Sequence, residues 1–264
     1  MKIKKLGNSL VIAFSMYSKI PMPQADWTSE NKKYVMCLFP FIGVFIAGAM
    51  MAWRFLANWI EIGEVLQAIV LVMIPVALTG GIHMDGLMDT TDALASCQRR
   101  DRKLEILKDP HTGAFAVMAC SLYLFLNFGV WYEILTQPKV TIVSLLVIGV
   151  GFIMSRALSA FAVVTFPLAK DSGLAAMFQK ESEKRMTKIV CSILIFFCIL
   201  LIVWVSPTLG GMGIAGAGIA FLYYYRMSKK QFGGITGDLA GYFLQICELL
   251  IAGMVMLGGK LFLS

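Results

Sequence analysis

Three aspartates at helical spacing are the residues of this chain best suited to chemistry. Asp85, Asp89 and Asp92 occupy positions i, i+4 and i+7, which on a helix puts all three carboxylates on one face. Neighbours on that face lie roughly 6 Å apart and repel each other by about 3 kcal/mol. A hard divalent cation would relieve this repulsion, since Mg²⁺ takes oxygen ligands and is often shared between carboxylates and substrate phosphates. We therefore predict a magnesium site at these three residues.

The alternative interpretation is a solvated acidic helix start, because aspartate in a first turn is favoured by the helix dipole. The surroundings favour chemistry. Both histidines of the chain, His83 and His111, flank this segment, and six of the 16 acidic residues fall between Asp85 and Asp109. A histidine that only fixes the start of the acidic helix is as good an explanation for His83 as one that contacts phosphate.

A second charged stretch, residues 99–109, follows within one loop. A helix through it would put Arg102, Glu105 and Asp109 on one face, with Lys108 beside them. Aspartates for a metal, with arginine and lysine for phosphate oxygens, suit transfer of a phosphoryl group from a diphosphate.

That reaction also needs a group that accepts the proton of the attacking hydroxyl. A carboxylate not fully committed to the metal serves this purpose. Asp92 and Asp109 are both candidates, with Lys108 as a further catalytic residue, and the sequence does not choose between the two carboxylates.

The composition is that of an integral membrane protein: 58% hydrophobic residues, 15% charged residues and a mean hydropathy of +0.77. We predict an all-α polytopic bundle in a single domain, residues 1–264, with an interfacial helix within residues 1–20. Seven apolar stretches are long enough to cross a bilayer: 35–60, 65–84, 114–136, 140–168, 189–205, 209–225 and 239–259.

The fifth and sixth stretches are the least regular of the seven. Ser206, Pro207 and the glycines from Gly210 to Gly218 favour either a broken or re-entrant hairpin or close helix packing. The six cysteines have no CxxC spacing, so we expect reduced packing residues.

The basic residues predict the orientation. Nineteen of the 23 lysines and arginines fall in four segments, 2–33, 99–108, 170–188 and 226–230, which seven alternating spans put on one face. The positive-inside rule makes that face, and with it the active site, cytoplasmic. The net charge of +7 then reflects topology and contact with the lipid bilayer, and we expect no nucleic-acid partner.

Two ionisable residues lie inside predicted spans. Arg156 is either a substrate clamp or a buried packing residue, and Glu248 is its natural partner. Near the start of the last span, Asp238 either lines the cytoplasmic pocket or, like Thr236, caps the helix.

Several ordered segments closely resemble the signature of the cobalamin synthase family, the adenosylcobinamide-GDP ribazoletransferases. The central ones are residues 79–92 (TGGIHMDGLMDTTD) and 104–109 (LEILKD) with Gly113. Other segments similar to the family are residues 19–23, 39–43, 155–156 and 233–238, together with Glu248.

This resemblance implies a Mg²⁺-dependent enzyme of the prokaryotic cell membrane, late in the vitamin B12 pathway. It would join adenosylcobinamide-GDP to α-ribazole or its 5′-phosphate and release GMP. The expected substrate- and phosphate-binding residues are Lys19, His83, Arg102, Glu105, His111, Arg156 and Asp238. A homo-oligomer and contacts with other enzymes of nucleotide-loop assembly are further expectations.

Three positions depart from the family pattern. Lys19 and His111 stand where arginine is common, and Ala93 replaces a frequent glycine. Lysine keeps the charge at position 19 but loses the bidentate fork of arginine, and a histidine makes phosphate binding at position 111 weaker or sensitive to pH.

Two other functions remain as alternatives. A CDP-alcohol phosphotransferase also uses aspartates, Mg²⁺ and a nucleotide-diphosphate donor, but its motif has an aspartate three residues before the Asp-Gly pair, where this chain has Ile82. A secondary transporter or cation channel would use Asp85, Asp89 and Arg156 along a path. No inverted repeat is visible, and the charges gather at one rim.

Overall fold

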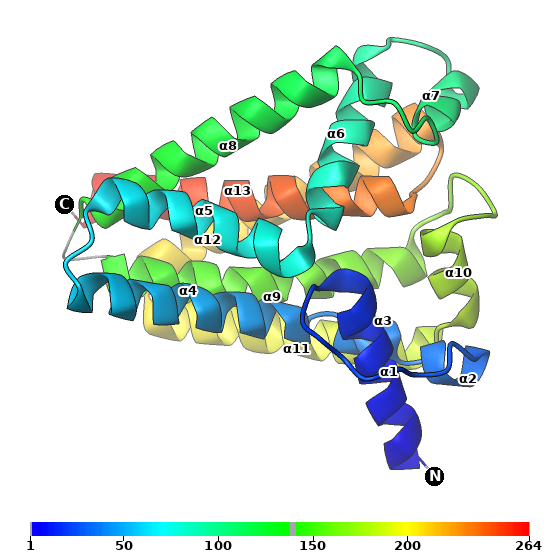
Figure 1. Ribbon diagram of the computed structural model, residues 1–264, viewed down its shortest axis with the longest axis horizontal. Coiled ribbons are helices and arrows are strands. Elements are labelled where there is room, and N and C mark those ends of the chain that lie inside the picture. The colour runs from blue at the N-terminus through cyan, green and yellow to red at the C-terminus, as the bar shows by residue number, and fades with distance from the viewer. Residues whose placement is uncertain (1, 138–140, 264) are drawn as a thin grey trace.

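The computed structural model describes residues 2–137 and 141–263, and it is a bundle of long helices with shorter helices across one end (Figure 1). The long helices are α4 (Phe41–Trp59), α5 (Glu64–Thr79), α8 (Ala114–Leu135), α9 (Thr141–Thr165), α11 (Lys184–Val205), α12 (Pro207–Met227) and α13 (Gly237–Phe262). Apart from one isolated bridge between Leu168 and Ile235, no residue of the described ranges forms a strand. The all-α prediction is confirmed.

The shorter elements gather at one end of the bundle, the right-hand end in Figure 1. They are α1 (Lys2–Tyr17), α2 (Ser29–Lys32), α3 (Val35–Leu38), α6 (Ile82–Ala95), α7 (Arg100–Ile106), α10 (Leu174–Glu181) and the π-helix η1 (Ser228–Phe232). Lys32 of α2 forms an ion pair with Glu181 of α10 (2.7 Å), and Lys103 of α7 donates to Gln231 of η1 (2.6 Å). The four basic segments therefore meet at the same end of the molecule.

Five helices are long and apolar enough to cross a membrane: α4, α8, α9, α11 and α13. The pair α5 and α6 passes the same test together but is bent by 94°, which gives a sixth crossing if the pair is one broken span. α12 is an unbroken helix that falls short of this hydropathy. The apolar helices indicate a multi-pass membrane protein, and the count of seven crossings stays a prediction.

Two predicted spans differ at their ends from the observed helices. The first, 35–60, is divided into α3 and α4 by a turn at Phe39 and Pro40, and the second, 65–84, ends at Thr79. Proline has no N–H to donate to the carbonyl four residues earlier, so Pro40 interrupts the helical hydrogen bonds, and Gly80 takes a left-handed conformation (φ 65°). The predicted first residue of the fourth span, residue 140, lies outside the described ranges.

The glycines of α12 serve close packing, which was one of the two alternatives for this segment. A Cβ atom at Gly210 would lie 2.6 Å from the carbonyl oxygen of Ile202 on α11, and one at Gly216 would lie 2.8 Å from that of Leu250 on α13. The cysteines that the structure describes are all free, and only Cys97 is exposed. The prediction of reduced cysteines is therefore confirmed for the described ranges.

Inside the bundle, Arg156 of α9 and Glu248 of α13 form the predicted ion pair. Nη1 of Arg156 lies 2.7 Å from Oε1 of Glu248, and the arginine side chain is fully buried. The Ser155 hydroxyl donates to the same carboxylate oxygen (3.1 Å), and the guanidinium lies over the ring of Phe152. These contacts favour the interpretation of Arg156 as a packing residue that joins two long helices.

We expect the single substitutions Arg156→Leu and Glu248→Leu each to destabilise the protein by about 3–5 kcal/mol, because each leaves one buried charge without its partner. The double variant removes both charges and should recover most of that loss. Unfolding of the three variants in mixed detergent micelles measures the free energies. If the free energy of unfolding of the double variant is no higher than that of the less stable single variant, the two residues are not coupled.

Candidate active site

The acidic helix α6 leaves the bundle through a double-glycine turn. Gly80 and Gly81 both have positive φ (65° and 79°), a conformation that costs glycine little, and α6 begins directly after them. The N-terminal arm holds this turn: the main-chain N–H of Lys19 donates to the carbonyl of Leu78 (2.7 Å), and the aliphatic part of its side chain lies across Gly80. Lys19, a predicted phosphate-binding residue, is thus placed at the start of α6.

Close contact between α6 and α13 brings the acids of the two helices together. A Cβ atom at Gly86 would lie 2.5 Å from the main-chain oxygen of Asp238, and one at Gly241 would lie 3.3 Å from the main chain of His83. Both glycines therefore allow the backbones of α6 and α13 to touch, which larger residues would prevent. The contact places Asp238 beside the aspartates of α6.

Asp89 lies close enough to these negative charges for them to shift its pKa. Its pKa is raised from 3.8 to about 6, first by burial and then by the negative charges of Asp85, Asp238 and Asp92. Like charges and desolvation both disfavour the ionised carboxylate. The predicted helix that carries the three aspartates is confirmed, and the structure adds Asp238 to their group.

Asp92 has a structural role that the sequence did not reveal. The N–H of Gly113 donates to its Oδ2 (2.7 Å) and the N–H of Ala116 donates to its Oδ1 (2.8 Å). These N–H groups lie at the start of α8, where the helix itself offers no partners, so Asp92 caps α8 from a neighbouring helix. Each of its two oxygens accepts one hydrogen bond from the start of α8, and its place as a third metal ligand stays a prediction.

The described residues contain no group of three His, Cys, Asp or Glu side chains that converge closely enough to hold a metal ion by themselves. The donors still fit a hard cation, because the carboxylates of Asp85 and Asp89 are hard oxygen donors and Asp89 sits in an excess of negative charge. Mg²⁺ commonly uses only one or two protein carboxylates and takes its other ligands from water and substrate phosphates.

The second charged stretch differs from the prediction. α7 ends at Ile106, so Lys108 and Asp109 lie beyond the helix, and Asp109 does not share a helical face with Arg102 and Glu105. Two local effects end the helix there: Pro110 disfavours the helical conformation at Asp109, and the Asp109 carboxylate accepts a hydrogen bond from the N–H of His111 (3.0 Å).

The predicted phosphate-binding residues of this stretch are exposed. Arg102 pairs with Glu105 (2.6 Å), and His111 Nδ1 lies 2.7 Å from Asp109 Oδ1. The hydrogen bonds from His111 lower the pKa of Asp109. Within the described ranges the Lys108 side chain makes no ion pair and is exposed. The link from Asp92 to Gly113 keeps this loop next to α6.

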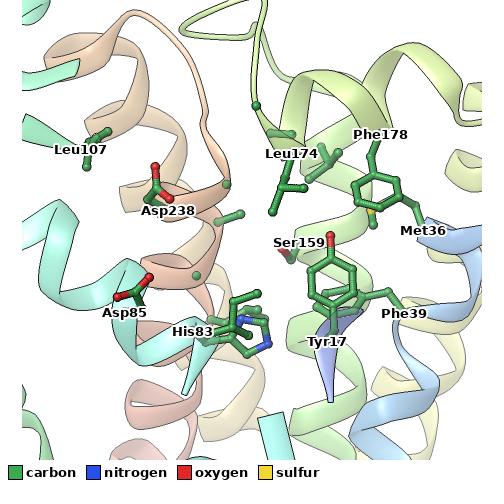
Figure 2. A pocket seen from close by; sticks show the side chains of 18 of the residues that line it. Tyr17, Met36, Phe39, His83, Asp85, Leu107, Ser159, Leu174, Phe178 and Asp238 are labelled. Atoms are coloured by element: carbon green, nitrogen blue, oxygen red, sulfur yellow. The ribbon is translucent and has the colours of Figure 1, made fainter. Parts of the chain in front are cut away.

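A cavity of about 400 Å³ opens beside Asp85 and Asp238 (Figure 2). His83 also lines it and is only 4% exposed, and its burial lowers its pKa to about 3, so the imidazole is neutral. Lys170, which the sequence indicated only as part of a basic segment, lines the same cavity. The Leu168–Ile235 bridge holds the loop of Lys170 against the start of α13. These segments are far apart in the sequence, so no local sequence pattern predicts their contact.

The two interpretations of Asp238 are both represented in the structure. Thr236 accepts the N–H of Leu239 (3.2 Å) and caps α13, so the predicted helix start is confirmed, and Asp238 itself lines the cavity. Arg156 is not among the residues that line it.

Comparison with known sequences identifies the chain. The sequence model of the cobalamin-5-phosphate synthase family matches residues 9–256. The chain belongs to this family. The match covers the acidic helix, the cavity and both glycine contacts between α6 and α13, so the whole site lies within the family's sequence.

Bacterial relatives match over nearly their full length. A protein of Lachnoclostridium phytofermentans is 43% identical over 94% of this chain and 93% of its own length. Proteins of Clostridium botulinum strain Alaska E43 (32% identity, 94% and 96%) and Desulfitobacterium hafniense (33% identity, 91% and 93%) are also similar. Each is named adenosylcobinamide-GDP ribazoletransferase. No solved structure matches the chain significantly.

Asp92 offers a test that separates its capping contacts from a role in proton transfer. We expect Asp92→Ala to lower the stability by about 1–2 kcal/mol, because two N–H groups of α8 lose their acceptor. Asp101→Ala, at an exposed acid of the neighbouring helix, is the matched control. Thermal unfolding in detergent measures both.

The companion variant Asp92→Asn keeps the shape and one acceptor oxygen. If Asp92 is the proton acceptor, this variant loses turnover even though its unfolding midpoint falls less than that of Asp92→Ala. If the carboxylate only caps α8, turnover falls no further than the stability does.

Proposed function

We propose that the chain catalyses a late step of cobalamin synthesis, in which adenosylcobinamide-GDP and α-ribazole, or its 5′-phosphate, are joined and GMP is released. Family membership and the names of the relatives support this activity. The observation that carries the assignment to a site is the group of carboxylates around Asp89, which lies beside a cavity large enough for part of a substrate.

In the proposed reaction a hydroxyl of the ribazole attacks the phosphorus attached to cobinamide. The bond from that phosphorus to the GMP oxygen breaks, and the proton of the hydroxyl passes to a carboxylate. No covalent enzyme intermediate is needed. Asp92 and Asp109 remain the two candidates for the proton acceptor, and the capping contacts of Asp92 would fix its position beside α8.

Asp85 and Asp89 are the residues we propose as holders of Mg²⁺, with Asp92 close enough to add its charge. When bound, the ion would neutralise the diphosphate and its leaving group. Lys19 at the turn before α6 and Lys170 at the cavity supply the positive charges for the substrate phosphates. Arg102 of α7, with Lys108 and His111 in the loop after it, adds further basic groups nearby.

The position of the site in the cell follows from charge. The four basic segments meet at the end of the bundle that carries the carboxylates (Figure 1). We propose that this end faces the cytoplasm and that the protein resides in the cytoplasmic membrane. A homo-oligomer and contacts with other enzymes of nucleotide-loop assembly belong to the same proposal.

The activity is tested with purified protein in detergent, adenosylcobinamide-GDP, α-ribazole 5′-phosphate and Mg²⁺. We expect release of GMP together with a joined corrinoid, both followed by chromatography. EDTA and the variant Asp89→Asn should each abolish the product, because either one removes the cation or one of its ligands. Asp101→Asn serves as the charge-matched control. GMP without joined corrinoid would indicate hydrolysis, and no turnover by folded protein would reject the proposal.

The repulsion at Asp89 predicts how stability depends on pH. Its folded-state pKa of about 6 lies above the ordinary 3.8, so the folded protein holds this proton more tightly than the unfolded chain does. The resulting destabilisation is fully present above about pH 6 and disappears below about pH 4. Without Mg²⁺, Asp89→Asn should therefore raise the thermal midpoint by about 2–4 °C at neutral or higher pH and change nothing in acid.

Mg²⁺ should raise the midpoint of the wild-type protein and leave that of Asp89→Asn nearly unchanged, since a bound ion stabilises only the state that binds it. Scanning calorimetry with and without the ion measures both effects. Equal stabilisation of the two proteins by Mg²⁺ would place the ion elsewhere.

A further inference from the structure

The cavity beside the carboxylates has two chemically different walls (Figure 2). On one side α6 and α13 supply Asp85 and Asp238, and His83 of α6 lies between the two walls with its imidazole facing Tyr17. On the other side α1, α3 and α10 supply aromatic and sulfur-containing side chains, among them Tyr17 and Phe178. A ligand that fits this cavity needs an apolar, flat part and a polar part.

The apolar wall is built around the ring of Tyr17. Its centroid lies 4.6 Å from that of Phe39 and 6.1 Å from that of Phe178, and the ring is nearly parallel to the imidazole of His83 (24°, 6.3 Å). Flat rings pack well against such surfaces, by offset stacking or edge-on contact. Phosphate and ribose, which are polar on all sides, would leave their hydrogen-bonding groups unsatisfied here.

His83 gives this wall one unused polar group. It is 4% exposed, and neither ring nitrogen has a hydrogen-bond partner in the described parts of the chain; Nε2 is fully buried, so Nδ1 is the nitrogen that a ligand in the cavity can reach. A buried nitrogen without a partner is rare in proteins and calls for a ligand or ordered water. One imidazole suits a heterocycle with a single free ring nitrogen.

The chemical parts of the two substrates differ in how well they fit this cavity. A corrin ring is too large for a cavity of about 400 Å³. Guanine fits by size, but its edge carries several donors and acceptors, whereas the side chains next to the aromatic rings offer it the Tyr17 hydroxyl, His83 and Ser159. The lower-ligand base of ribazole is flat, apolar over most of its surface and has one free ring nitrogen.

We infer that this cavity binds the aromatic base of the ribazole acceptor, stacked against Tyr17 and hydrogen-bonded to His83, with its ribose toward Asp85. The opposite side of the cavity suits that ribose, because Asp85 and Asp238 can accept hydrogen bonds from its hydroxyl groups and Lys170 can contact a 5′-phosphate. This assignment rests on the proposed function and adds an acceptor subsite formed jointly by the N-terminal arm and the bundle.

Steady-state kinetics of Tyr17→Leu test the inference. Loss of the ring should raise the KM for α-ribazole 5′-phosphate about tenfold, the usual scale for stacking of a base on an aromatic side chain, and leave the KM for adenosylcobinamide-GDP unchanged. The matched control is Tyr132→Leu, since Tyr132 is stacked on Phe128 (6.1 Å) on α8 and does not line the cavity. An unchanged KM for the ribazole, or a raised KM for the corrinoid donor, would overturn the assignment.

A second measurement uses the unaltered protein and does not depend on the folding of a variant. A photoreactive azidobenzimidazole riboside should label peptides that contain Tyr17, Phe39 or Phe178, and α-ribazole but not GMP should protect them. Labelling outside the cavity, or protection by GMP, would contradict the inference. If the label lands in the cavity but the protein shows no turnover with both substrates, the base subsite stands while the proposed function fails.

Discussion

Backbone contact between α6 and α13 is the constraint on which the site depends. Gly86 and Gly241 let the two helices meet without intervening side chains, and this contact sets Asp238 beside the aspartates of α6 and forms one wall of the cavity. A polar cluster would not hold the helices together by itself, because its charges have the same sign. Packing therefore supplies the energy that keeps the carboxylates close.

Hydrogen bonds to neighbouring elements hold both ends of the acidic helix. The two oxygens of Asp92 accept hydrogen bonds from free N–H groups of α8 and fix one end, and the main-chain N–H of Lys19 holds the other end at the double-glycine turn. The carboxylates of Asp85 and Asp89 are left for a ligand. α6 is thus clamped at both ends, as expected of a helix that must present charged groups in a fixed geometry.

The sequence predicted those features that depend on short-range spacing or on strong pairing rules. The helix that carries Asp85, Asp89 and Asp92 follows from their periodicity, and the pairing of Arg156 with Glu248 follows from the cost of an unpaired charge among apolar helices. The predicted helix through Asp109 was wrong, because α7 ends at Ile106 and Pro110 disfavours the helical conformation at Asp109. The apolar wall of the cavity could not be predicted, since Tyr17 and Phe178 meet only through tertiary packing.

The Arg156–Glu248 pair also constrains how the protein is made. The partners are 92 residues apart, so Arg156 leaves the ribosome roughly 5–20 s before Glu248 at ordinary rates of synthesis. During that interval α9 carries an unpaired guanidinium, which costs about 2.5–3.5 kcal/mol at the centre of a membrane helix. The guanidinium of α9 therefore gains its buried partner only once α13 has been inserted, and the two helices can pack in their final arrangement only after that point.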